Sequence, residues 1–220
     1  MPLSPGKGVP VFLRRLVCLS VVLCAVSLAP ARAAAISAAE LLDARLDYTA
    51  DFSVSSGLKG SYAGRVIHAP GRERREFDGM GGREILLLRR DIDEATVMWP
   101  ERRMYVSTSF SQLSGMVGGI EEMMLERRKS GAETLGGEAC TVYDVTGSSS
   151  QGGSFRGKMW MTQDGILMKA KGSVRFNGKD TAVETGLAHL QRIKSDPQAF
   201  TRPADYMGMP INLKALGLSH

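Results

Sequence analysis

The residues that could carry metal chemistry in this 220-residue chain are few and widely spaced. An acidic turn at 91–94 could suit a cation, but a turn of this kind is more often a solvated loop. No cysteine or carboxylate stands at zinc-finger, metalloprotease or calcium-loop spacing from any of the three histidines, His68, His189 and His220. We therefore expect no metal site.

The serine and glycine patterns of hydrolases and nucleotide-binding proteins are incomplete. Ser114 lacks the preceding glycine of a G-x-S-x-G nucleophile elbow. The glycine-rich run 115–119 lacks the Lys-Ser or Lys-Thr ending of a phosphate-binding loop. We predict that the protein is not an enzyme and uses no cofactor.

Methionine, tryptophan and arginine side chains are the candidates for contacting a ligand. The flexible methionine thioether adapts to irregular apolar ligands, although methionine also fills ordinary cores. The basic clusters 72–75 and 127–129 would suit lipid headgroups or an acidic partner, although clusters this small are more often solvated. The candidate ligand-binding residues are Met98, Trp99, Met123, Met124, Trp160 and Arg72.

The first 33 residues have the order of a secretion signal. Arg14 and Arg15 end a positive region, an apolar run at 16–28 follows, and Ala31-Arg32-Ala33 forms a small-residue cleavage site. The run is shorter than the roughly 20 apolar residues that span a bilayer, so an uncleaved anchor is the weaker interpretation. The sequence matches the twin-arginine export motif, and the lipidation motif at Cys18 or Cys24, less well than it matches an ordinary secretion signal.

We therefore expect export by the general secretory pathway, cleavage after Ala33 or Ala35, and a periplasmic product without a transmembrane anchor. The leader holds four basic residues and no acid, so the formal charge of +5 falls to +1 after cleavage. A chain this close to neutral does not favour nucleic-acid binding. Cleavage also leaves Cys140 as the one cysteine, and its apolar neighbours predict burial rather than reactivity.

Residue periodicity predicts a mainly β domain at 34–220 with no second domain. Ser37 and Glu40 form a capping box that begins a short helix. A second, amphipathic helix is expected at 112–131, and a proline-rich, irregular segment from Ser195. Alternating apolar and polar residues predict strands at 47–55, 60–69, 72–78, 83–90, 95–99, 102–108, 139–146, 155–162, 166–176 and 180 to about 194.

An antiparallel sheet of about ten strands tends to curl, because a flat open sheet of that size is unusual. The inserted helix would then cover the concave apolar face as a lid. This predicts a curled antiparallel sheet, or unclosed β-barrel, that encloses a cavity.

Several motifs resemble the LolA/LolB-like lipoprotein-carrier superfamily, especially its uncharacterised exported members. They are the strand 64–70 followed by Arg72 and Arg75, the pair 97–100 and 104–105, the hairpin 160–165, and the ending 196–203. The carrier has an arginine beside the proline that ends its second main strand, where this chain has Ala69 before Pro70.

The resemblance implies a half-barrel cavity that shelters lipoprotein acyl chains, another lipid or an apolar peptide from water. The function expected from it is non-enzymatic binding or carriage of an apolar ligand in the periplasm. The alternative is an envelope interaction or sensor module that uses the same curled sheet to recognise a protein partner.

Overall fold

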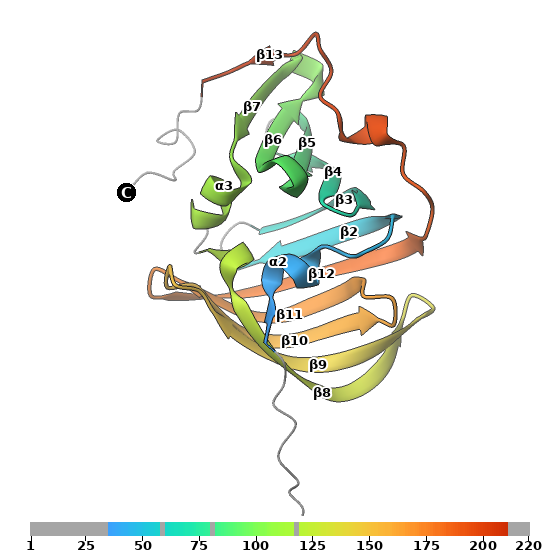
Figure 1. Ribbon diagram of the computed structural model, residues 1–220, viewed down its shortest axis with the longest axis vertical. Helices are drawn as coiled ribbons and strands as arrows, with labels where there is room; N and C mark the ends of the chain where they lie inside the picture. Colours follow the sequence, from blue (N-terminus) through green and yellow to red (C-terminus); the bar gives the residue numbers. More distant parts are fainter. Residues whose placement is uncertain (1–34, 58–59, 80–81, 117–118, 211–220) are drawn as a thin grey trace, which may run out of the picture. The chain divides into compact units, whose positions relative to one another are not determined.

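The computed structural model describes residues 35–57, 60–79, 82–116 and 119–210. The leader at 1–33, with Cys18 and Cys24, lies outside the described residues, as does His220. Within the described part the chain forms a single curved sheet with short helical segments beside it (Figure 1). The prediction of a mainly β, unclosed architecture is confirmed.

The sheet has 13 strands in the order β1-β8-β9-β10-β11-β12-β2-β3-β4-β5-β6-β7-β13. All neighbours are antiparallel except β13, which runs parallel to β7. The strands are β1 (Ile36–Ser37), β2 (Tyr48–Ser56), β3 (Gly60–Ala69), β4 (Arg72–Gly79), β5 (Gly82–Arg89), β6 (Glu94–Trp99), β7 (Met104–Thr108), β8 (Met124–Leu135), β9 (Glu138–Ser148), β10 (Ser154–Thr162), β11 (Leu167–Phe176), β12 (Lys179–Gln191) and β13 (Met207–Gly208).

The turns follow from residues that tolerate positive φ. Asn177 and Gly178, at φ of 49° and 74°, join β11 to β12, and Gly165, at 88°, lies in the turn between β10 and β11. Asn-Gly and Asp-Gly pairs favour tight turns of this kind. The bulge at Trp160/Met161 bends β10 against β11.

The first helix, α2 (Ala38–Leu42), begins as predicted. The Ser37 side chain accepts a hydrogen bond of 3.1 Å from the backbone N–H of Glu40. Two of its residues, Ala38 and Leu41, are buried. This cap holds a helix of only five residues in place beside the sheet.

The predicted helix at 112–131 is wrong over its second half. Helix α3 (Phe110–Met116) and the 3-10 turn η4 (Ile120–Glu122) are followed by the long strand β8, which pairs with β9. Gly119 takes a φ of +66°, which interrupts a helix. Met123 and Leu125 are buried while Met124 between them is half exposed, which is the alternation of a strand.

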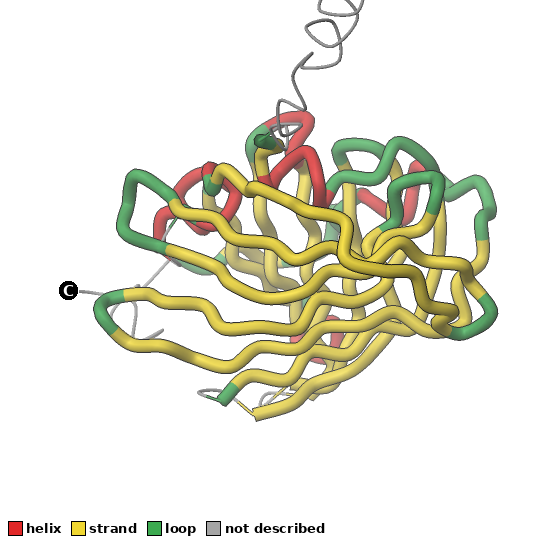
Figure 2. Tube along the Cα trace, turned by 90° about the horizontal axis from the view of Figure 1, so that it is seen from below, coloured by secondary structure: helices red, strands yellow, loops and turns green. Residues whose placement is uncertain are grey.

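The C-terminal segment is largely irregular, as its prolines predicted. It contains η5 (Pro197–Phe200) and β13, with the remainder irregular. Phe200 is buried, and Tyr206 packs against Ile85, Leu87 and Met98 of β5 and β6. Remaining helical segments η2 (Arg90–Ile92) and η3 (Pro100–Arg102) lie between strands. Figure 2 shows the strands as one curved layer with most helical segments gathered along one rim.

Candidate functional site

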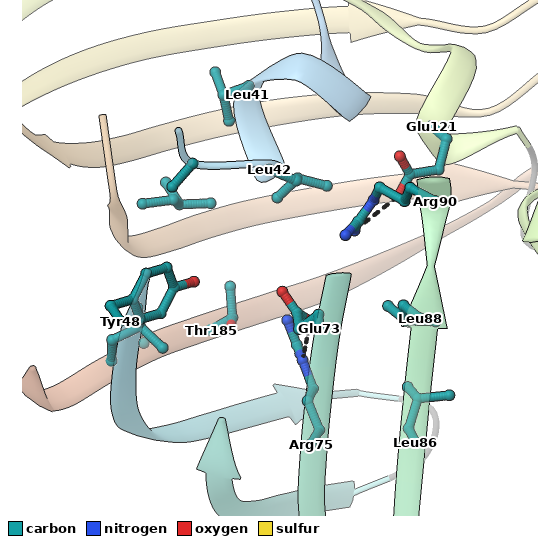
Figure 3. Close-up of a pocket in the computed structure, with 14 residues that line it drawn as sticks. Leu41, Leu42, Tyr48, Glu73, Arg75, Leu86, Leu88, Arg90, Glu121 and Thr185 are labelled. Carbon is teal, nitrogen blue, oxygen red and sulfur yellow. Dashed lines mark hydrogen bonds and ion pairs between the residues drawn. The ribbon is translucent and has the colours of Figure 1, made fainter. Parts of the chain in front are cut away.

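A cavity of about 210 Å³ lies between helix α2 and the face of the sheet that this helix covers (Figure 3). Its wall combines leucine side chains with a small set of charged groups. The lining residues are Leu41, Leu42, Ala44, Tyr48, Glu73, Arg75, Leu86, Leu88, Arg90, Glu121, Leu167, Thr185, Gly186 and Leu187. An apolar pocket with a few convergent polar groups is the usual form of a small-molecule site.

Strand register explains why apolar and charged groups meet here. Glu73 and Arg75 of β4 are two residues apart, so both side chains point to the same face of the sheet. In the pairing with β5, Glu73 is opposite Leu88 and Arg75 is opposite Leu86. The four side chains therefore form one wall, with α2 facing them.

Glu73 and Arg75 form an ion pair in which the carboxylate is buried and the guanidinium is half-buried. Arg75 Nε donates to Glu73 Oε1 at 2.7 Å, and the Glu73 side chain is only 3% exposed. The Arg75 guanidinium also lies over the Phe52 ring, 5.1 Å from its centroid. Burial raises the pKa of Glu73, but the charge of Arg75 and the neighbouring His68 and Arg90 outweigh it and hold the pKa at about 2.

His68 supports the ion pair from the neighbouring strand. Its side chain is fully buried, Nε2 is 2.9 Å from the backbone oxygen of Ala44, and Nδ1 is 3.6 Å from Glu73 Oε2. The first distance is that of a hydrogen bond and the second is too long for one. The Nε2 contact connects β3 to the residues that follow α2.

Arg90 and Glu121 form the other polar end of the cavity. Arg90 Nη2 is 3.5 Å from Glu121 Oε1, and the guanidinium lies over the Phe110 ring at 5.0 Å. Among the described residues, Arg90 Nε, Arg90 Nη1 and Glu121 Oε2 are buried without a hydrogen-bond partner. Burial raises the pKa of Glu121 and outweighs the opposing charge of Arg90. In Figure 3 the Arg90 guanidinium points into the space between Leu42 and Glu73.

The six residues predicted from the sequence lie elsewhere, and none is among the described residues that line this cavity. Met98 is buried in the cluster formed by Ile85 and Leu87. Arg72 is partly exposed and donates from Nε to Asp91 at 3.0 Å. Met123 packs near Leu41 in the core, and half of Met124 is exposed.

The two tryptophans have structural partners. Trp99 Nε1 donates to Glu84 at 3.2 Å. Trp160 is buried, donates from Nε1 to Glu133 at 2.6 Å, and lies 5.4 Å from the Lys169 ammonium. A ligand-binding role for these six residues stays a prediction.

Sequence reasoning missed the charged residues inside the cavity. It treated Arg72, Arg74 and Arg75 as one basic cluster, whereas strand alternation places Arg75 on the opposite face from Arg72 and Arg74. Arg74 pairs with Glu76 at 2.7 Å, and Arg75 alone of the three lines the cavity. The alternation within β4, together with the apolar residues of the next strand, could have indicated that Glu73 and Arg75 face an apolar wall.

Across residues 35–57, 60–79, 82–116 and 119–210, no three histidine, cysteine or carboxylate side chains lie close enough together to hold a metal ion. In the same part of the chain, no helix has the length and apolar character needed to cross a membrane.

Cys140 is buried within the core, as its neighbours predicted. Burial raises the pKa of its thiol, which disfavours the reactive thiolate. Asp91 accepts hydrogen bonds from Arg72 and Arg89, and Asp93 accepts one from the backbone N–H of Ser111. The acidic turn is therefore used within the fold.

Comparison with known proteins finds likeness in structure. No family model matches the sequence, and no curated protein matches it. An uncharacterized conserved protein from Thermus thermophilus matches 75% of this chain and 90% of its own, with a TM-score of 0.50 and 13% identity. At this identity the similarity is one of fold.

Two other solved structures are also similar. A LolA superfamily protein from Nitrosomonas europaea matches 76% of this chain and 98% of its own, with a TM-score of 0.40 and 12% identity. MucB in the Pseudomonas aeruginosa MucA/MucB complex matches 79% of this chain and 64% of its own, with a TM-score of 0.45 and 10% identity. The solved structures that this chain is similar to thus include members of the LolA superfamily.

Proposed function

We propose that the processed protein is a non-enzymatic periplasmic binding or carrier protein for a lipid, a lipoprotein acyl chain or another apolar ligand. The observation that carries the proposal is the leucine-lined cavity between α2 and the sheet. Burying apolar ligand surface there stabilises a complex by about 25 cal/mol per Å², without directional chemistry. Export, removal of the leader at 1–33 and a single domain at 34–220 belong to the same proposal.

The volume of the cavity is small for this function, which limits the size of the ligand that it can enclose. A volume of about 210 Å³ is below the roughly 300–1,000 Å³ of sites that enclose drug-sized ligands. A single acyl segment fits better than a whole lipid. Because α2 has only five residues and packs on η4 and β1, its displacement would enlarge the space.

Ligand binding is tested by purifying the protein from an envelope fraction and recording native mass spectra. A fluorescent fatty acid then reports affinity for the emptied protein. Leu88→Trp, which fills the cavity, should reduce affinity at least about tenfold. Ile92→Trp is the control, because Ile92 is 56% exposed and lies outside the lining. A protein that is always empty and ignores the fatty acid would contradict the proposal.

A second candidate function is recognition of an envelope protein, and the edge of the sheet favours it. Strand β8 has 12 residues, but β1 pairs with only Met124 and Leu125. Among the described residues, no strand pairs with the following part of its outer edge, which leaves backbone groups for an added strand. The exposed Arg128 and Lys129 would suit an acidic segment.

This alternative predicts a stoichiometric protein complex without bound lipid. Reversing charge with Arg128→Glu and Lys129→Glu should weaken the complex. The matched control reverses two exposed charges elsewhere, with Arg156→Glu and Lys179→Glu. A complex equally sensitive to both pairs would argue against edge recognition.

A further inference from the structure

Arg90 has more hydrogen-bonding capacity than the protein uses. Its side chain is 13% exposed, and within the described residues Nε and Nη1 have no hydrogen-bond partner. In the part of the chain that the structure describes, its one charged contact, Glu121, is 3.5 Å away. A buried guanidinium in this state retains a large part of its desolvation cost, because its donors have lost water without gaining acceptors.

The other cavity charges do not satisfy Arg90. Glu73 is already paired with Arg75 at 2.7 Å, so these two charges balance each other. Arg90 faces the cavity, whose nearby wall is formed by Leu42 and Leu88. The arrangement places one incompletely paired cation at the end of an apolar space.

We infer that Arg90 binds the carboxylate of a singly charged acyl amphiphile whose hydrocarbon segment lies against Leu42, Leu86 and Leu88. This inference rests on the proposed function and names the chemical class of the ligand. A carboxylate supplies acceptors for the free N–H groups of Arg90, and charge-assisted bonds of this type are stronger than neutral ones. The leucines bury the first part of the chain.

The charge of the site favours a monoanion over a phosphate. Arg75 balances Glu73, so the charges left among the described lining residues are those of Arg90 and Glu121. A doubly charged headgroup would exceed the single positive charge of Arg90 and would meet the Glu121 carboxylate beside it. A neutral alcohol has the same apolar contacts but gives Arg90 a weaker acceptor. We therefore expect the carboxylate to bind most tightly, and the alcohol and the phosphate ester to bind more weakly.

The test compares three ligands of equal chain length on the processed protein at neutral pH: decanoate, decanol and decyl phosphate. Competition with a fluorescent apolar probe gives the three affinities. Decanoate should bind about tenfold to a hundredfold more tightly than decanol. Decyl phosphate should bind more weakly than decanoate.

Two variants assign the preference to Arg90. Arg90→Met should lower decanoate affinity to that of decanol and leave decanol affinity nearly unchanged. Arg175→Met is the matched control, because it removes the same charge from an exposed position outside the cavity and should keep the preference. Circular dichroism and urea unfolding confirm that each variant is folded.

The outcomes separate this inference from the proposed function. If decanol and decanoate bind wild-type protein equally well, carboxylate recognition is refuted while apolar binding stands. If neither binds, both proposals are refuted. Tighter binding of decyl phosphate, or an unchanged preference in folded Arg90→Met, also overturns the inference. Because the ligand series needs only wild-type protein, a variant that does not fold leaves the test intact.

Discussion

The ring of His68 is stacked on the ring of Tyr48, with centroids 4.7 Å apart and an angle of 20° between the planes. The two residues are directly opposite each other in the pairing of β2 with β3. Tyr48 lines the cavity, and His68 lies behind it against Glu73. The stack therefore connects the cavity wall to the hydrogen bond that His68 makes with Ala44.

His68→Asn should destabilise the protein by about 2–4 kcal/mol, because it removes the stacked ring and leaves a buried gap beside Ala44. Urea unfolding followed by tryptophan fluorescence measures the change. His189→Asn is the matched control: its side chain is 82% exposed, and asparagine tolerates its positive φ. A similar loss in both variants would contradict a structural role specific to His68.

Glu73 predicts a defined acid sensitivity. Folding lowers its pKa from 4.5 to about 2, so the ionised form stabilises the protein above pH 4.5. This contribution, of a few kcal/mol, is lost as the pH falls from 4.5 towards 2. Urea unfolding measured across this range should show the loss.

Glu73→Gln should reduce that pH dependence and cost about 1–3 kcal/mol at neutral pH, because the half-buried Arg75 guanidinium loses its charged partner. The exposed Glu126→Gln is the control and should follow the wild-type profile. An unchanged acid profile in Glu73→Gln would show that other carboxylates dominate.

Two glycines face each other where β10 pairs with β11. Gly157 is directly opposite Gly172, and a Cβ on Gly157 would lie 2.3 Å from the Lys171 oxygen and 2.9 Å from the Phe155 ring. Gly157→Val should therefore cost about 1–3 kcal/mol in unfolding free energy.

Gly131→Ala is the control for the glycine effect, since the nearest atom to its Cβ would be 4.0 Å away. That variant should be neutral or more stable by about 0.4–1 kcal/mol. If Gly157→Val were as stable as the wild type, the close approach of β10 and β11 would not require glycine at position 157.

The Cys140 thiol should react with iodoacetamide only when the protein unfolds, because burial both shields it and raises its pKa. Mass spectrometry of the processed protein with and without urea measures the modification. A cysteine at the exposed position 150, in Ser150→Cys, should be modified without urea. Rapid modification of Cys140 in the folded protein would contradict its burial.

Local patterns determined most of the strands. The alternation at 47–55 and 60–69 and the Asn177-Gly178 turn depend on neighbouring residues, and β2, β3 and the β11–β12 hairpin appear where the sequence predicted them. The capping box before α2 is also local. A prediction from periodicity succeeds where one face of a strand is buried and the other is solvated.

In the segment after Gln112, the helix predicted from local residue spacing is wrong over its second half. Its apolar spacing matched a helix, but pairing with β9 stabilises an extended chain from Met124 onward. The benefit of that pairing comes from residues on a separate strand, so a local pattern does not contain it. Tertiary contacts routinely override intrinsic propensity in this way.

The sequence by itself determined the antiparallel, curled character of this protein and the absence of a recognisable catalytic motif. Only the tertiary structure decided which side chains share the cavity: α2, β4, β5 and η4 bring Leu42, Glu73, Leu88 and Glu121 together. The same folding removes Arg90 from water without supplying all its partners. Burial and pairing depend on which elements pack together, and a linear pattern of residues does not specify that packing.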